Sequence, residues 1–352
     1  MNRWANVKCP SGASDAVQTE VVPVQSPLQE LTEPAVPASV RPAASPRTTT
    51  PAAPVDARKA GEEILNAFTV DVEDYFQVSG FDRHIRRDRW DSFEGRVVAN
   101  TRRVLRLLER HDVLGTFFIL GWVADRHPRL VREIHRRGHE IGSHSFWHRL
   151  IYEQTPEQFR ADLRQSRDAL EGAIGQRVTA YRAPSFSITA RSLWALEILA
   201  EEGFEVDSSV FPIYHDRYGI PHAEPRLHRL AVGGGSLWEF PPSVARFAGV
   251  NVPVGGGYFR LCPLWWTLLC LRRIRRLGQP AMLYVHPWEI DPEQPRLAAG
   301  TRLSRFRHYV NLAATERKLD TLLRKHRFGR LCDVIGRAHA AGGGSTVSAE
   351  AP

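Results

Sequence analysis

Apolar residues along the middle of the chain follow two different periods in alternation. Short runs rich in Val, Ile and Phe predict strands at 64–72, 115–120, 139–143, 178–182 and 204–207. Between these runs, apolar residues recur at helical spacing and predict helices at 96–111, 128–137, 156–174 and 189–202. This alternation indicates parallel strands joined by right-handed crossovers, and in α/β barrels of this kind the functional groups lie at the carboxyl ends of the strands.

Two flanking segments have neither period. Residues 1–60 are rich in Pro, Ala, Ser and Thr, and this composition predicts a disordered leader. Residues 338–352 end in GGGSTVSAEAP and predict a flexible tail. The folded part of the chain is therefore expected within 62–337.

Composition narrows the choice of partners. Of the 352 residues, 43% are apolar and 24% charged, as in globular proteins. The formal net charge of +8 fits an acidic polymer, an anionic membrane or nucleic acid, or simply an Arg-rich surface. No nucleic-acid-binding motif is recognised, so that partner is not expected. The four cysteines show neither CxxC nor zinc-finger spacing, and a disulfide framework is not expected.

The most apolar stretch bears on location. The run LCPLWWTLLCL at 261–271 is shorter than the about 20 residues that span a bilayer. The basic run RRIRR at 272–276 follows it, so we expect a core helix with a solvated basic end. An amphipathic helix lying on a membrane surface is the alternative. Because the N-terminus has no apolar signal segment, the expected location is the cytoplasm or the periphery of the inner membrane.

An acidic cluster, DVED at 71–74, follows the first predicted strand. Side chains two residues apart on a strand point to the same side, so Asp71 and Glu73 are expected to face one pocket. If the strand runs straight through Glu73, Asp74 points away; if the chain turns directly after Val72, Asp74 can enter the pocket. An ordinary acidic loop after a strand is the simpler interpretation of this cluster alone.

Two further clusters follow later strands. His144 and His148 are four residues apart, a spacing that places both imidazoles on one face of a helical turn, where they can bind one metal ion. Arg182, in YRAPSF at 181–186, lies at a strand end and can hold a carboxylate ionised and oriented. Taken singly, a stray HxxxH and a surface Arg before a turn remain alternatives.

Together, and in this order, these motifs resemble the NodB-homology polysaccharide deacetylases, carbohydrate esterase family 4. That family combines an acidic pair after the first strand, H-[ST]-x-x-H, an R-x-x-P-like motif and a late Leu-x-His. The late motif is approximated by LYVH at 283–286, with one extra residue. The likeness covers about 64–290. A closer resemblance is to deacetylases of exosortase A and exopolysaccharide gene clusters, which share TVDVEDYFQV, YRAPSFSI, DSSVFP and a C-terminal region similar to HPWEID and HYVNLAATERKL.

The resemblance implies a fold and an activity. The fold is a distorted (β/α) barrel at 62–290 with a C-terminal extension at 291–337. The activity is metal-dependent removal of acetyl groups from N-acetylhexosamine units of a polysaccharide, in exopolysaccharide biosynthesis. Zinc is the first choice of metal, while Co, Ni and Mn also suit two histidines and a carboxylate.

The resemblance also implies site residues. Asp71 is the general base, Arg182 steadies it, and His286 donates a proton to the leaving amine. The metal ligands are Glu73, His144 and His148, with Asp74 as the alternative to Glu73, because this chain has Asp-Val-Glu-Asp where most of the family has adjacent Asp residues. Expected substrate-binding residues are Tyr75, through a backbone N–H near it that would stabilise the oxyanion, Pro184, Phe186, and Trp288 stacked against a sugar ring. A core histidine on a buried strand is the alternative for His286.

Two other functions are alternatives. A hydrolase of small cyclic or linear amides is one, since allantoinase-like proteins share the NodB-type barrel and a fold does not fix the substrate. A non-catalytic glycan-binding protein is the other. Base, both His ligands, Arg and acid are all present here, which favours catalysis over binding alone.

Overall fold

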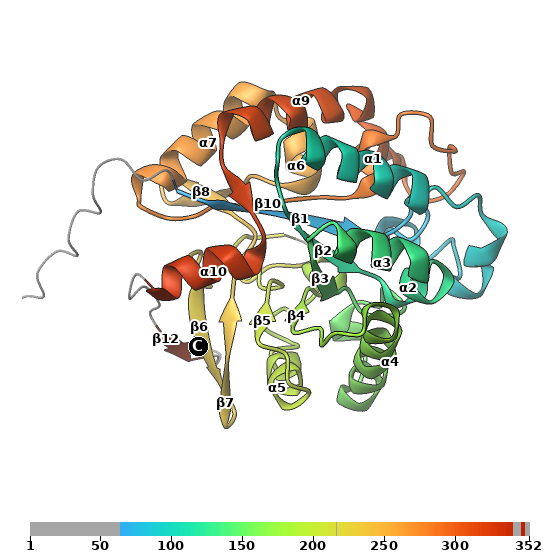
Figure 1. Cartoon of the computed structure of the whole chain (residues 1–352), viewed down its shortest axis with the longest axis horizontal. Coiled ribbons are helices and arrows are strands. Elements are labelled where there is room, and N and C mark those ends of the chain that lie inside the picture. The colour runs from blue at the N-terminus through green and yellow to red at the C-terminus, as the bar shows by residue number, and fades with distance from the viewer. Residues whose placement is uncertain (1–63, 216, 341–345, 349–352) are drawn as a thin grey trace, which may run out of the picture. The chain divides into compact units, whose positions relative to one another are not determined.

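The computed structural model describes residues 64–215, 217–340 and 346–348. A mixed sheet has the order β10-β1-β2-β3-β4-β5-β7-β6-β12 (Figure 1). In addition, β11 pairs with β1. Its strands are β1 (Asn66–Val72), β2 (Thr116–Ile119), β3 (Glu140–Ser143), β4 (Ala180–Tyr181), β5 (Val206–Asp207), β6 (His228–Val232), β7 (Gly235–Glu239), β10 (Met282–Val285), β11 (Phe328–Gly329) and β12 (Thr346–Ser348). All pairings are parallel except that of β6 with β7.

The predicted α/β class is confirmed, but the sheet is not closed. Within the described residues no pairing joins β10 to β12, the two ends of the strand order. After β5 the strict strand–helix repeat stops, because β6 and β7 form an antiparallel hairpin. A second hairpin, β8 (Val244–Phe247) with β9 (Val250–Pro253), lies outside the main sheet. The arrangement is therefore an open form of the expected barrel.

The four helices predicted in the first half of the chain are present, and the short α2 (Gly121–Arg126), which the pattern does not predict, is an addition. The other helices are α1 (Val97–Arg110), α3 (Pro128–Arg136), α4 (Pro156–Ile174), α5 (Trp194–Glu201), α6 (Gly256–Leu261), α7 (Leu264–Arg276), α8 (Arg302–Tyr309), α9 (Leu312–Lys325) and α10 (Leu331–Ala340). Helix α4 begins after Thr155, which forms a capping box with Gln158, and ends at Gly175 with φ of +70°. Helix α5 begins later than predicted, because the Ser192 hydroxyl accepts from Thr189 N–H in a turn ahead of it.

β1 is the strand on which the site depends. All seven of its residues are buried, and it lies between β10 and β2. A strand enclosed in this way is usually rich in apolar residues, and Ala67, Phe68, Val70 and Val72 fit that requirement. The polar exceptions are Asn66, which hydrogen-bonds neighbouring backbone at the start of the strand, and Thr69 and Asp71, which have hydrogen-bond partners at the site.

The C-terminal region belongs to the same core as the first half. β11 pairs with the start of β1, and the fully buried Leu319, Leu322 and Leu331 come from α9 and α10. The expectation of a flexible tail over 338–352 is wrong for two parts: residues 338–340 continue α10, and Thr346–Ser348 pair with β6. The expected leader, 1–60, lies outside the described residues.

The apolar run at 261–271 contains the end of α6 and most of α7. One face of α7 is buried through Cys270, Leu271 and Ile274, as expected for a core helix. Its opposite face is not covered: Trp265 is 64% exposed and Leu269 40% exposed. No helix in the described part of the chain is long and apolar enough to cross a membrane.

Candidate active site

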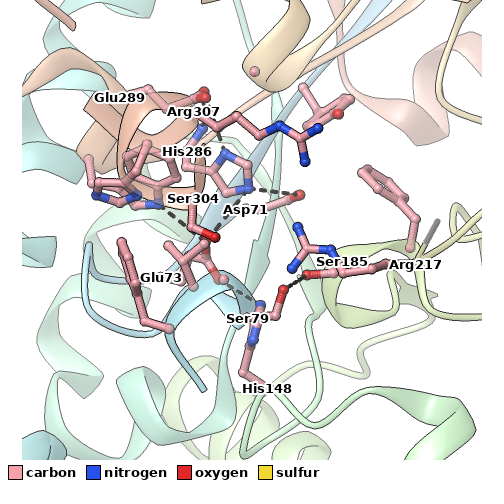
Figure 2. Close-up of a pocket in the computed structure, with 18 of the residues that line it drawn as sticks. Asp71, Glu73, Ser79, His148, Ser185, Arg217, His286, Glu289, Ser304 and Arg307 are labelled. Atoms are coloured by element: carbon pink, nitrogen blue, oxygen red, sulfur yellow. Dashed lines mark hydrogen bonds and ion pairs between the residues drawn. The ribbon is translucent and has the colours of Figure 1, made fainter. Parts of the chain in front are cut away.

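A pocket of about 180 Å³ opens at the carboxyl ends of neighbouring strands (Figure 2). Asp71 and Glu73 come from the end of β1, and His144 and His148 follow β3. His286 follows β10, the strand on the other side of β1. The sheet order thus brings together residues that are up to 215 positions apart.

Glu73, His144 and His148 form the one cluster of potential metal ligands found among the described residues. Their ligand atoms all lie within 4.8 Å of one another, and all three residues are buried. Glu73 Oε2 is 2.7 Å from His148 Nε2. His144 Nδ1 lies 2.8 Å from the carbonyl oxygen of Arg182, which makes Nδ1 the donor and leaves Nε2 free as a ligand. Two imidazoles and one carboxylate in this arrangement fit a divalent metal ion.

The charge states of these groups also suit metal binding. Burial alone would raise the pKa of Glu73, but the charge and hydrogen bond of His148, then His286 and His144, lower it to about 2. Burial lowers the pKa of His144 to about 4, although the nearby Asp71 opposes this shift. An ionised carboxylate and a neutral imidazole are the forms that bind metal.

The segment that carries the two histidines is not the helical turn expected from their spacing. Ser145 and His148 have φ of +62° and +51°, so the chain forms an irregular loop. The Asp162 carboxylate on α4 holds this loop by accepting from the backbone N–H groups of Phe146 (2.7 Å) and Trp147 (3.1 Å). Backbone outliers of this kind persist only where surrounding contacts impose them, and they concentrate at functional sites.

Glu73 and Asp74 diverge at the end of β1. The strand ends at Val72, and the chain turns there, since the Glu73 N–H donates to the Asp71 carbonyl oxygen at 3.1 Å. Glu73 nevertheless lies in the pocket beside Asp71. Asp74 points to the start of α1, where its carboxylate accepts from the N–H groups of Arg96 (2.7 Å) and Val97 (2.9 Å). Asp74 thus caps a helix and is not among the clustered ligands.

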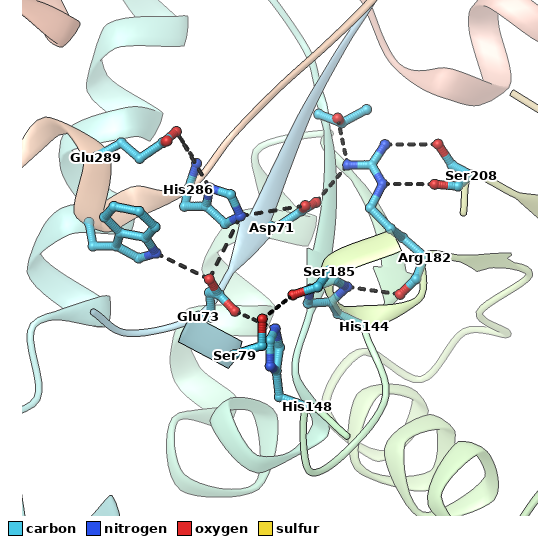
Figure 3. Close-up of polar contacts among 12 residues, drawn as sticks. Asp71, Glu73, Ser79, His144, His148, Arg182, Ser185, Ser208, His286 and Glu289 are labelled. Atoms are coloured by element: carbon cyan, nitrogen blue, oxygen red, sulfur yellow. Dashed lines mark hydrogen bonds and ion pairs between the residues drawn. The ribbon is translucent and has the colours of Figure 1, made fainter. Parts of the chain in front are cut away.

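Arg182 holds Asp71 (Figure 3). Its guanidinium, fully buried, donates to Asp71 Oδ1 at 2.6 Å and to the Thr69 hydroxyl at 2.8 Å. The other end donates to Ser208 Oγ at 2.9 Å and contacts Met282 Sδ at 3.3 Å. Because Arg182 is held at both ends, the Asp71 carboxylate has a fixed orientation, with its second oxygen 3.9 Å from His286 Nε2.

His286 stands at the mouth of the pocket, with its side chain 18% exposed. Its Nε2 is 3.7 Å from Glu73 Oε1, and its Nδ1 is 3.5 Å from Glu289 Oε2. Burial favours the neutral imidazole, but the charge and hydrogen bond of Glu289, followed by Glu73 and Asp71, raise the pKa of His286 to about 9. The imidazolium is therefore the form present at neutral pH, ready to donate a proton.

Glu289 and Arg260 are site residues that the sequence reasoning missed. Glu289 is fully buried, and its Oε1 accepts from Arg260 Nε at 2.7 Å. Burial opposes its ionisation, but Arg260 and His286 lower the pKa of Glu289 to about 2. The HxxE spacing of His286 and Glu289 was a signal for this contact, whereas nothing in the sequence near Arg260 pointed to it.

The expected substrate-binding residues separate into two groups. Phe186 lines the pocket, whereas Pro184 is buried and is not among the lining residues. Tyr75 does not line the pocket either: its ring is in the core and its N–H donates to the Asp74 carboxylate at 2.9 Å, so it is not available for an oxyanion.

Trp288 lines the pocket, but its side chain is occupied by contacts with neighbouring site residues. Its indole N–H donates to Glu73 Oε1 at 3.2 Å, and its ring stacks on those of His286 and His308, with centroids 5.1 Å and 4.2 Å apart. Because these contacts cover the indole, which is only 4% exposed, Trp288 offers no sugar-stacking face, contrary to the expectation.

Two family models match adjacent parts of the chain. Residues 89–204 match the model described as polysaccharide deacetylase, and 208–336 match a domain of unknown function (DUF3473). The first match contains His144, His148 and Arg182, and the second contains His286. Asp71 and Glu73 precede both.

Curated relatives align with part of the chain. The peptidoglycan-N-acetylglucosamine deacetylase of Bacillus cereus is 31% identical over 98 residues, 28% of this chain and 36% of the relative. The peptidoglycan-N-acetylmuramic acid deacetylase PdaA of Bacillus subtilis is 32% identical over 84 residues, 24% and 32% of the two chains. The chitooligosaccharide deacetylase of Azorhizobium caulinodans is 30% identical over 97 residues, 27% and 43%. The alignments thus span less than half the length of these relatives.

A solved structure shares the fold over a longer stretch. The crystal structure of a predicted polysaccharide deacetylase from Mycobacterium smegmatis superposes with a TM-score of 0.57 and 22% identity, covering 86% of this chain and 99% of that one. The polysaccharide deacetylase family model and the curated relatives together support the family that the sequence motifs resemble.

Proposed function

We propose that this protein is a metal-dependent deacetylase that hydrolyses the acetamide of N-acetylhexosamine units in a polysaccharide. The observation that carries this proposal is the buried Glu73–His144–His148 cluster, which lies against an Arg-held carboxylate and a cationic histidine. Zinc is the proposed metal. A metal ion bound there would polarise the acetamide carbonyl and make water more acidic.

The chain's own residues supply the proton transfers. Asp71, held by Arg182, accepts a proton from the water that adds to the acetyl carbon. His286 donates its Nε2 proton to the leaving nitrogen as the carbon–nitrogen bond breaks, and the products are acetate and a free amine. Glu289 keeps His286 protonated until that step.

We place this reaction in exopolysaccharide biosynthesis, because the motifs at 69–78, 181–188 and 207–212 resemble those of deacetylases from such gene clusters. We also propose that 62–290 form the catalytic region and that 291–337 complete it. Support for the second point comes from His308, whose ring packs on Trp288 beside Glu73.

Replacement of Asp71 tests the mechanism directly. Asp71→Asn keeps the shape of the side chain but removes the proton acceptor. We expect acetate release from N-acetylglucosamine oligomers to fall about 10²–10⁴-fold, the usual contribution of a general base, with metal content unchanged. Activity near that of the wild type would rule out Asp71 as the base. Ring-opening hydrolysis of cyclic ureides by the wild type, without acetate release from the oligomers, would favour the amide-hydrolase alternative.

We further propose that the protein associates peripherally with the cytoplasmic face of the inner membrane through α7. Trp265 and Leu269 lie four residues apart on its exposed face, and Arg272 and Arg276 continue the same side of the helix. An exposed apolar stripe with cationic residues suits an anionic lipid surface.

Vesicle sedimentation tests this location. We expect binding to phosphatidylglycerol vesicles but not to phosphatidylcholine vesicles, and we expect Trp265→Ser to weaken it. Tyr214→Ser is the matched control, since Tyr214 is 90% exposed outside α7. Equal loss in both variants, or no binding by the wild type, would exclude α7 as a membrane contact.

A further inference from the structure

Two arginines outside the catalytic cluster stand on the wall of the same pocket (Figure 2). Arg217 lies in the loop after β5 and Arg307 in the last turn of α8, and both are exposed. Neither forms an ion pair with a carboxylate among residues 64–215, 217–340 and 346–348. Many other exposed arginines of the chain are paired, as Arg86 is with Asp88 and Arg126 with Asp91.

The backbone under each arginine is fixed by buried contacts. The carbonyl oxygen of Arg307 accepts from Arg260 Nη2 at 2.9 Å, and the next residue, His308, is buried against Trp288. On the other side, Tyr218 stacks on Phe211 with ring centroids 5.8 Å apart and planes 8° apart. The two guanidinium groups therefore project from anchored backbone positions, and neither has a hydrogen-bond or ion-pair partner among the described residues.

Arg217 and Arg307 both lie close enough to Tyr218, a residue on the pocket wall, to influence its hydroxyl group electrostatically. Burial and the neighbouring Tyr258 raise the pKa of the Tyr218 hydroxyl, while Arg217 and Arg307 both lower it. Tyr218 itself lines the pocket. Two positive charges thus converge on one side of the cavity from segments about 90 residues apart in the sequence.

These charges are not needed to balance the carboxylates of the pocket. Asp71 already pairs with Arg182 at 2.6 Å, and Glu289 with Arg260 at 2.7 Å. Glu73 faces His148. The pocket therefore carries a positive surplus at its rim, where a neutral sugar chain would require none.

We propose that the substrate is an acidic polymer and that Arg217 and Arg307 bind an anionic group on a sugar next to the acetylated one. This inference rests on the deacetylase function proposed above and specifies its substrate. A guanidinium matches the two oxygens of a carboxylate or a phosphate, so a uronic acid or a phosphodiester in the polymer fits the same site. Both arginines belong to the segment matched by the domain of unknown function, which would thus supply the specificity.

The first test compares substrates that differ only in charge. One oligomer alternates N-acetylglucosamine with glucuronate, a second is the same oligomer with its carboxylates reduced to alcohols, and a third carries phosphodiesters instead. We expect kcat/KM to be at least about tenfold higher on the better anionic oligomer than on the reduced one, with a difference that shrinks as salt rises. Equal kcat/KM on all three would overturn the proposal, and the rank of the two anionic oligomers identifies the anion.

The second test removes each charge in the full chain. Arg217→Gln and Arg307→Gln should each reduce the preference for the anionic over the reduced oligomer by about fivefold, as expected for loss of one charge-assisted contact. Arg302→Gln is the matched control, because Arg302 is exposed on the same helix as Arg307 but does not line the pocket. Equal loss of preference in Arg302→Gln would mean a general effect of net charge and would contradict the proposal.

Direct binding separates this inference from the proposed reaction. Calorimetric titration with the three oligomers measures affinity whether or not acetate is released. Charge-dependent binding that the Arg217 and Arg307 variants weaken would support the acidic-polymer site even if no oligomer is deacetylated. Acetate release from all oligomers without charge-dependent binding would leave the deacetylase function in place and reject the site.

Discussion

At the scale of single residues, the site consists of groups whose neighbours fix their charge. His144 and His148 come from one irregular loop, yet they differ in role. His144 is tied to the Arg182 carbonyl oxygen, whereas His148 faces Glu73 directly. Arg182 therefore links the proposed base and the proposed metal ligands, since its side chain holds Asp71 and its carbonyl orients His144. A shift of this one residue would disturb both halves of the site.

Substitution of either histidine should remove the metal. In His144→Ala or His148→Ala we expect acetate release to disappear. We also expect metal affinity to fall by more than about 10–100-fold, which is the usual effect of removing a residue that only hydrogen-bonds to a metal ligand. His135→Ala is the control, because His135 lies on α3 outside the pocket. Metal analysis of the purified variants is the measurement, and full occupancy in both would reject the cluster as the metal site.

The raised pKa of His286 gives the pH profile a direction. Because the charged form is favoured, the imidazolium persists through neutral pH and is lost as pH rises through about 9, so kcat should decline there. In Glu289→Gln the strongest stabilising charge is gone, and the alkaline limb should move about 1–2 pH units lower, toward the ordinary value. Arg260 retains hydrogen bonds to the carbonyls of Arg307, His308 and Val310, which supports the fold.

Asp291→Asn is the matched control for this profile. Asp291 is also a buried carboxylate after β10, but it pairs with Arg96 and Asn100 and not with His286. The alkaline limb of the kcat–pH profile of Asp291→Asn should lie at the same pH as in the wild type. A limb that fails to move in Glu289→Gln would show that His286 is not the acid that sets it.

At the scale of elements, the turn at the end of β1 directs two adjacent carboxylates to different places. Glu73 enters the pocket, and Asp74 binds the start of α1. Glu73→Gln should lower metal affinity strongly with little change in thermal stability, since the amide is a poor ligand of the same size. Asp74→Asn should keep the metal but destabilise the fold by about 1–3 kcal/mol, because an amide cannot accept from all three N–H groups that Asp74 now binds. Metal analysis and thermal unfolding of both variants test these roles. Loss of the metal in Asp74→Asn, with the metal retained in Glu73→Gln, would make Asp74 the ligand.

Elements with a local signal were predictable from the sequence, and those fixed by distant contacts were not. The sequence predicts both ends of α4 where the structure has them, at 156 and 174. Thr155 caps the first turn, Pro156 suits the first helical position, and Gly175 adopts the positive φ that ends the helix. The HxxxH spacing predicts a helical turn for the histidine loop because it has the helical period, and nothing local in the sequence indicates that Asp162 binds the N–H groups of this loop. Likewise the spacing of Glu73 and Asp71 predicted a shared pocket, but the contact of Glu289 with Arg260 needs two segments that only the fold brings together.

At the scale of the whole molecule, the two ends of the chain should differ in importance. Among the described residues, those that line the pocket all lie between Asp71 and His308, and the described contacts of β1 are made by residues after 64. A chain that starts at Gly61 is therefore expected to fold and release acetate normally. A marked drop in its thermal stability would show that the segment before Gly61 packs on the folded part.

A chain that stops at Ile290 should fail, because the C-terminal region completes the core and does not merely extend it. It would lose β11, which pairs with the start of β1, three fully buried leucines from α9 and α10, and the His308 ring that stacks on Trp288. Each buried Leu contributes about 2–5 kcal/mol, so their sum is comparable with the about 5–15 kcal/mol that stabilises a whole domain. Leu331→Ala, a milder change in the full chain, should cost about 2–5 kcal/mol in thermal or denaturant unfolding while metal binding persists. Cooperative unfolding and metal binding in the chain ending at Ile290 would instead make 62–290 an independent domain.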